Sequence, residues 1–253
     1  MYIQTAILKN CILPRGKILS ALFFICVIAS CKKSTSSSSP AATQQEPPVA
    51  ITLIHTLPTI LKESSGLYYT DGNLWTFGDS GNANWIFKID TLTGAILQIV
   101  IIQNFPNEDW EDITADSEYI YIGDFGNNDG NRKDLKILKV KKSDINTSSL
   151  QVSVNAEAIN FSYADQLDFE ANSNTDYDCE AMAAIGNYLY IYAKDGGNLQ
   201  TRCYKLPKDT GTYTVVPLET FNTAGKVTSA AFNPVTKELM LGGYMNKKIF
   251  PFI

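Results

Sequence analysis

The stretch 109–128 decides the fold, because its pattern returns along the chain. It begins with DWEDI at 109–113 and continues, after a turn, with the aromatic segment YIYIGDFGNN at 119–128. An acidic residue thus leads into a small aliphatic strand. An aromatic strand follows and ends in Gly-Asp with Gly and Asn behind it. Two short strands around a tight turn are the signature of a β-hairpin.

Three further units share this pattern. They begin at ESSGLY (63–68), at DCEAM (178–182) and, more weakly, at VTSAAF (227–232). Glu63 precedes Glu111 by 48 residues, and Glu111 precedes Glu180 by 69, because the second unit carries an insertion. Strand-only repeats of this size are typical of β-propeller blades.

The sequence therefore predicts an all-β protein, a β-propeller of four-stranded antiparallel blades. The blades are expected at 62–102, 109–163 and 178–221, with a fourth from about 226. Strand segments such as 150–154 and 213–216 fall inside the second and third units. The alternative is a β-sandwich, which also has short strands and turns but gives no reason for a pattern that recurs at each unit start.

The first 30 residues have the composition of a secretory signal peptide. Three basic residues precede an apolar run at 18–28, which is too short to span a bilayer. The end of this leader, Ile28-Ala29-Ser30-Cys31, resembles a bacterial lipobox, which implies lipidation of Cys31 and a membrane anchor. The alternative is an ordinary signal followed by a chance cysteine. Residues 31–50, rich in Ser and Pro, predict a flexible tether, and 51–253 the globular domain.

Charge narrows the range of partners. The chain has a net charge of −5; without residues 1–30, which contain three basic and no acidic residues, 18 basic and 26 acidic residues remain and the net charge is −8. Such a surface argues against nucleic acid and favours cations or neutral ligands.

Few residues are available for redox or imidazole chemistry. Cys179 and Cys203 would lie on the first and third strands of one blade. Strands two spacings apart are separated by roughly 9–10 Å, which is too far for a disulfide. Two buried free thiols are therefore expected. The single histidine, His55, precedes the first blade, so a Ser-His-Asp triad and a histidine-rich zinc site are not expected.

The acids at the unit starts and turns predict a cation site. In a propeller the first strands line the axis, so these carboxylates would converge on one rim and repel one another unless a cation lies among them. Oxygen ligands of this kind suit Ca²⁺. The candidate metal ligands are Glu63, Glu111, Asp112, Asp124, Asn127 and Glu180. The alternative is that these side chains only cap backbone amides.

An enzyme built on this rim would work with carboxylates and a metal. Glu111 and Glu180 are the candidate catalytic acids or bases, and Lys194 and Arg132 the candidate groups for an anionic part of the substrate. Plain surface charge is the alternative for the two basic residues. The sequence does not decide whether the protein is an enzyme.

These motifs resemble those of a family of lipoproteins and secreted proteins from Bacteroidetes-type bacteria, and more distantly six-bladed propellers of the NHL, SdiA-regulated and phytase-like esterase type. The resemblance covers most of 58–245. The residues that carry it are GDSGN (78–82), WEDI (110–113), GDFGNN (123–128), YADQ (163–166) and DCEAM (178–182). It implies a propeller of roughly six blades and does not supply an activity.

On this basis the chain holds about four blades of a six-bladed ring and is expected to be truncated at its C-terminal end. The alternative is a closed four-bladed ring in which the segment 50–57 supplies the missing outer strand of the last blade. The expected protein is an envelope lipoprotein, attached to the membrane through Cys31, whose propeller face binds a small molecule, a glycan or a protein, with a structural Ca²⁺ as an option. The alternative is a metal-assisted hydrolase of esters, lactones or phosphoesters.

Overall fold

The computed structural model describes residues 52–245 and the backbone of 248–252. Within these residues the regular structure is 17 strands and two short 3-10 helices, η1 (Thr59–Leu61) and η2 (Lys142–Asp144). In this described part, no helix has the length and apolarity that a bilayer crossing requires. The expected leader, the lipidated Cys31 and the tether lie outside the described residues.

The first sheet begins the domain. Its order is β1 (Ser64–Thr70), β2 (Asn73–Gly78), β3 (Trp85–Asp90), β4 (Ile96–Ile102) and β8 (Gln151–Val154). Neighbours among the first four strands are antiparallel, and β8 pairs with β4 in parallel.

The second sheet has the same plan. Its order is β5 (Trp110–Ala115), β6 (Tyr119–Asp124), β7 (Lys136–Lys141), β9 (Glu157–Tyr163) and β13 (Gly211–Val215). The first four strands are antiparallel, and β13 pairs with β9 in parallel.

Two smaller sheets complete the described structure. The third sheet has the order β10 (Cys179–Ile185), β11 (Tyr188–Ala193), β12 (Thr201–Pro207) and β14 (Pro217–Phe221). The fourth consists of β15 (Lys226–Asn233), β16 (Glu238–Met245) and β17 (Lys248–Phe252). All their strand pairs are antiparallel.

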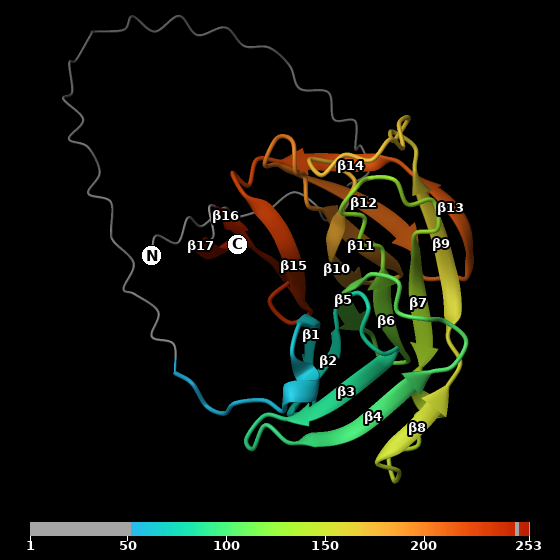
Figure 1. Ribbon diagram of the computed structural model, residues 1–253, viewed down its shortest axis with the longest axis vertical. Helices are drawn as coiled ribbons and strands as arrows, with labels where there is room; N and C mark the ends of the chain where they lie inside the picture. Colours follow the sequence, from blue (N-terminus) through green and yellow to red (C-terminus); the bar gives the residue numbers. More distant parts are fainter. Residues whose placement is uncertain (1–51, 246–247, 253) are drawn as a thin grey trace, which may run out of the picture.

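The four sheets follow one another around a common centre, with the first strand of each sheet innermost (Figure 1). Contacts between sheets run from β1 to β5, from β5 to β10 and from β10 to β15. The chain is therefore all-β and propeller-like, as the sequence predicted. In the described residues the sheets do not close into a ring.

Three separate cores lie between successive sheets. Phe77 of the first sheet meets Trp110 of the second edge to face, with ring centroids 5.5 Å apart. Tyr163 of the second sheet packs on Tyr204 of the third at 4.7 Å. A smaller cluster that contains Leu241 joins the third sheet to the fourth. A β-sandwich has one core between two layers, so this arrangement excludes the sandwich alternative.

The two parallel strands lie in sheets that the sequence did not predict for them. The segments 150–154 and 213–216 fall within the second and third units, yet β8 lies on the outer edge of the first sheet and β13 on that of the second. Each strand covers the backbone groups of β4 or β9, which would otherwise form a free sheet edge. Such long-range parallel pairing leaves no local signal in the sequence.

The segment 52–58 forms no strand in the structure, and the fourth sheet contains only β15, β16 and β17 among the described residues. Closure of a four-bladed ring by the segment 50–57 is therefore not seen in the part of it that the structure describes. His55 in this segment is exposed. Cys179 and Cys203 are buried on β10 and β12, and no disulfide links them, as predicted.

The position of Trp110 between two sheets predicts its contribution to stability. Its side chain is fully buried, so Trp110→Ala should lower the free energy of unfolding by about 3–5 kcal/mol, through lost contacts and the cavity left behind. Trp85, half-buried on the other face of the first sheet, is the matched control, and Trp85→Ala should lower it by less. Denaturant unfolding of both variants makes the comparison. Equal losses would contradict the packing described here.

Candidate metal centre

One residue is inserted at the same place in the first strand of every sheet. The pairing with the second strand slips after Ser64, Trp110, Cys179 and Val227. In each case a β-bulge follows, in which an extra residue faces no partner and re-aims its side chain. The residues at this place are Ser65, Glu111, Glu180 and Thr228.

All four bulge residues line one cavity of about 450 Å³. Hydroxyl groups surround the two glutamates, because Ser64 and Ser229 line the same cavity. The bulges therefore direct side chains from four sheets toward the axis, and two of these side chains are carboxylates.

The position of the bulge shows which residues correspond to one another in the four repeats. The matching place to Glu111 in the first sheet is held by Ser65 and not by Glu63. Glu63 lies before β1, is exposed and has a φ of 63°. Its carbonyl oxygen accepts the Asp79 N–H at 3.0 Å. Glu63 therefore shapes the entry to the strand and does not belong to the group of converging acids.

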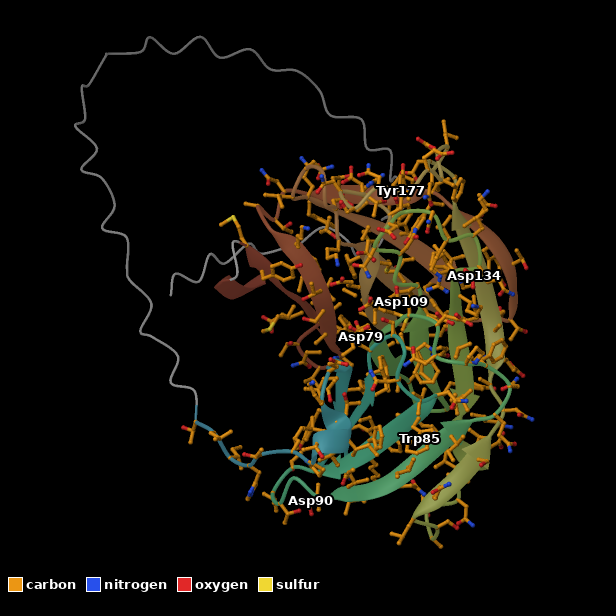
Figure 2. All side chains as sticks on the ribbon, in the orientation of Figure 1. Asp79, Trp85, Asp90, Asp109, Asp134 and Tyr177 are labelled. Atoms are coloured by element: carbon orange, nitrogen blue, oxygen red, sulfur yellow. The ribbon has the colours of Figure 1, made fainter. Side chains whose placement is uncertain are left out.

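Five carboxylates meet at the start of the first strands, and we call them the axial acidic cluster: Asp79, Asp109, Glu111, Asp178 and Glu180. Single oxygens of Asp79, Asp109 and Glu111 lie within 4.8 Å of one another, as do those of Glu111, Asp178 and Glu180. Glu111 is thus shared by two groups of three. Figure 2 shows Asp79 and Asp109 near the centre of the molecule, where the sheets meet.

Lys194 balances one half of this cluster. Its ammonium group forms ion pairs with Asp178, at 2.8 Å, and with Glu180. These charges raise the pKa of Lys194 despite its burial. No lysine or arginine between residues 52 and 245 forms an ion pair with Asp79, Asp109 or Glu111. The second half therefore lacks an ion pair among these residues, although the charge of Arg132 opposes the rise in the pKa of Asp109 that burial causes.

Glu111 is the least satisfied member of the cluster. The residue is only 8% exposed. Its nearest donor, the Ser65 hydroxyl, lies 2.9 Å from the Glu111 carbonyl oxygen and 3.4 Å from the carboxylate. A hydroxyl has one proton, and the shorter contact takes it. The carboxylate is thus left without a good donor among the described residues.

The electrostatics follow from this burial. Burial raises the pKa of Glu111, and the nearby charges of Glu180 and Asp109 raise it further. Burial also raises the pKa of Glu180, against the opposing effect of Lys194, and that of Asp109. Repulsion within the cluster is relieved when a proton or a metal cation binds.

Gly126 allows the close approach of two of these acids. A Cβ atom at this position would overlap the carboxylates of Asp109 and Glu111. Glycine is therefore required here by space. The glycine thereby lets the 126–128 turn lie close to Asp109 and Glu111.

The remaining predicted ligands make other contacts. Asp112 accepts the N–H groups of Met182 at 2.6 Å and Ile113 at 2.8 Å, and so joins β5 to β10. Burial raises the pKa of Asp112 to about 8. Asn127 receives the Arg132 N–H on its side-chain oxygen and gives its amide to the Tyr177 carbonyl. Both side chains therefore support the fold around the cluster.

Asp124 and Arg132 form an ion pair with each other. The distance between the charged groups is 3.0 Å, and Lys136 is a second partner of Asp124 at 3.2 Å. Arg132 also pairs with Asp134 at 3.1 Å. Of the predicted catalytic, substrate-binding and metal residues, the structure thus brings together Glu111, Glu180 and Lys194. Arg132 and Asp124 form an adjoining network, which meets the cluster where Asp124 accepts the Asp109 N–H at 3.2 Å.

Asp109 was not among the predicted ligands, although a signal for it existed. Asp109 and Asp178 each precede a bulge glutamate by two residues, in DWE (109–111) and DCE (178–180). Asp79 occupies the place that Lys194 has in the third sheet, because both follow the residue that pairs with the start of the first strand. The repeated Asp-x-Glu spacing could have identified the aspartates.

No family model matches this chain, and no curated protein matches it. Among solved structures, it is similar to the computationally designed Ika4 protein, with 13% identity and a TM-score of 0.37 over 80% of this chain and 98% of that one. It is also similar to RS223-β-xylosidase, with 10% identity and a TM-score of 0.42 over 70% of this chain and 62% of the xylosidase. Likeness at these scores carries no argument about function.

The raised carboxyl pKa values predict how stability depends on pH. Some carboxyl groups bind their proton more tightly in the folded than in the unfolded chain. For such a group, the free energy of unfolding falls as pH rises above the pKa that the group has in the unfolded chain. We expect the Tm of the metal-free protein to fall between about pH 5 and pH 10, because burial raises the pKa of Asp112 to about 8 and that of Glu111 to about 10. Glu111→Gln, which resembles the protonated form, should reduce this slope.

Thermal denaturation at a series of pH values measures how the Tm depends on pH. Glu63→Gln is the control, because it makes the same chemical change at an exposed glutamate. Identical slopes in Glu111→Gln and the unaltered protein would show that this carboxyl group does not hold a proton in the folded state.

Proposed function

We propose that this protein is a lipid-anchored envelope domain that binds Ca²⁺ at the axial acidic cluster. The carrying observation is Glu111, a buried carboxylate without a good donor that faces a cavity and belongs to two groups of acids. The ligands would be Asp79, Asp109 and Glu111, the half of the cluster that forms no ion pair among the described residues.

The donor set favours calcium over other metals. All five members of the cluster offer carboxylate oxygens, and neither of the described cysteines belongs to it. Ca²⁺ accepts six to eight oxygen ligands in variable geometry, whereas Mg²⁺ requires a small octahedral site. The hydroxyl-lined cavity next to Glu111 leaves room for water or ligand oxygens to complete the coordination.

A cation here would act first on the fold. Asp79 ends the first sheet's inner hairpin, and Asp109 and Glu111 begin the second. A bound ion would thus join two sheets and remove the repulsion that adds to the effect of burial in raising the pKa of Glu111. Its remaining coordination positions would face the cavity, where an oxygen of a small molecule, a glycan or a protein could bind.

The membrane anchor rests on the lipobox-like sequence that ends at Cys31. We also propose that the four sheets belong to a ring of about six. The outer face of the first sheet supports this, because Trp85, Ile96 and Ile99 stay partly exposed around the buried Phe87 and Ile89, as a face that packs on a further sheet would.

Metal-assisted hydrolysis is the second candidate, and one observation favours it. Glu111 has a raised pKa and lies beside Glu180, which Lys194 helps to keep ionised. Two neighbouring carboxyl groups with different proton affinities can serve as general acid and base. The substrates would be esters, lactones or phosphoesters.

Calcium titration of the full chain by calorimetry tests the proposal. We expect saturable heat, and Glu111→Gln and Asp109→Asn should each weaken binding by roughly tenfold or more, as expected when a charged ligand is lost. Glu63→Gln is the matched control and should bind as the unaltered protein does. Absence of heat, or equal weakening in Glu63→Gln, would contradict the site.

A panel of esters, lactones and phosphoesters separates the two candidates. Calcium binding without turnover supports the binding domain. Turnover that is abolished in Glu111→Gln would contradict the binding domain and support the metal-assisted hydrolase.

A further inference from the structure

A second cavity, of about 170 Å³, opens between the first and second sheets. It lies beside the β1–β2 turn, whereas the axial acidic cluster lies at the other end of these strands, where β2 ends and β5 begins. Tyr68 on β1 and Trp75 on β2 form one wall, and Ile120 and Ile145 contribute apolar surface. This cavity, which we call the lysine cavity, is thus independent of the proposed calcium site.

A buried amide has a fixed orientation in this cavity. Gln98 is 4% exposed, and its Nε2 group donates to the carbonyl oxygens of Asn146 and Ser149, both at 2.7 Å. Two carbonyl acceptors can be satisfied only by the NH₂ end of the amide. The Gln98 Oε1 atom therefore has no donor among residues 52–245 and is available to a ligand that carries an N–H or O–H group.

Two ammonium groups and one carboxylate line the same space. Lys88 lies over the Trp75 ring, with Nζ 5.7 Å from the centroid, and forms no ion pair in the described structure. Lys142 donates to the Asp116 carbonyl oxygen, and burial lowers the pKa of this lysine. Asp71 is the one acidic residue of the lining. The lining residues alone thus have a formal charge of +1, and Asp116, which acts on Lys142 from outside the lining, is itself paired with Lys208 at 2.8 Å. One anionic group would balance this charge.

The volume of the lysine cavity and the chemistry of its walls limit which ligands can bind there. A cavity of about 150 Å³ is enough for a benzene molecule, so the lysine cavity accommodates one ring with small substituents. The aromatic and aliphatic wall suits the flat face of such a ring. The polar groups then specify one negative charge and one hydrogen-bond donor on it.

We propose that the lysine cavity binds a small ring carboxylate that carries a hydroxyl group. The carboxylate would pair with Lys88 and Lys142, the ring would lie against Trp75 and Tyr68, and the hydroxyl group would donate to Gln98 Oε1. Both a hydroxylated aromatic acid and a sugar acid have this chemistry.

Calorimetric titration of the full chain with 4-hydroxybenzoate and with D-glucuronate tests the proposal. At least one of them should bind, and the tighter one identifies the ring as aromatic or saturated. Lys88→Met keeps the aliphatic contact with Trp75 and removes the charge. It should weaken binding by about tenfold, the effect of losing one charged hydrogen bond.

Two controls make the result specific. Lys205 lies over the Tyr188 ring at 3.5 Å in the third sheet, outside the cavity, so Lys205→Met makes the same change in a similar setting and should leave binding unaltered. The neutral amide, 4-hydroxybenzamide, should bind more weakly than the acid. Absence of binding by both acids, or equal affinities of Lys88→Met and Lys205→Met, would overturn the proposal.

Discussion

One extra residue in the first strand of each sheet determines which side chains face the cavity at the axis. Without the β-bulge, strict alternation along the strand would leave Glu111 and Glu180 against a neighbouring sheet, where an ionised carboxylate is expensive to bury. With it, both side chains reach the cavity at the axis, together with Ser65 and Thr228. The following residue of the second sheet, Asp112, then accepts backbone N–H groups from two sheets and holds the inner strands in register.

The charge distribution around the axis is uneven, and this unevenness gives the cluster its properties. Lys194 acts as an internal cation for Asp178 and Glu180, so that half is held together by ion pairs within one sheet. Asp79, Asp109 and Glu111 come from two sheets and have no such partner among the described residues. A mobile cation is the simplest means of balancing them, which is why we propose calcium for this half and a structural role for Lys194.

Much of the fold and part of the site could be predicted from the sequence. The returning acidic and aromatic pattern identified the all-β, propeller-like arrangement, and the expected strand positions of Cys179 and Cys203 correctly predicted that no disulfide links them. Glu63 was misaligned by two residues, because the place of Glu111 is held in the first sheet by Ser65, which the acidic pattern does not identify. Asp124 and Asp195 end similar aromatic strands, yet their partners, Arg132 and Arg202, become visible only when the strands are paired. The exchange of β8 and β13 between sheets likewise depends on distant strand edges.

The most direct test of this account is anomalous X-ray diffraction from crystals of the protein grown with Tb³⁺, which replaces Ca²⁺ at oxygen-ligand sites. We predict a strong peak among the carboxylates of Asp79, Asp109 and Glu111, on the axis side of the bulge. A peak confined to the Asp124 network, or no ordered ion, would contradict the assignment of the axial acidic cluster as a metal centre.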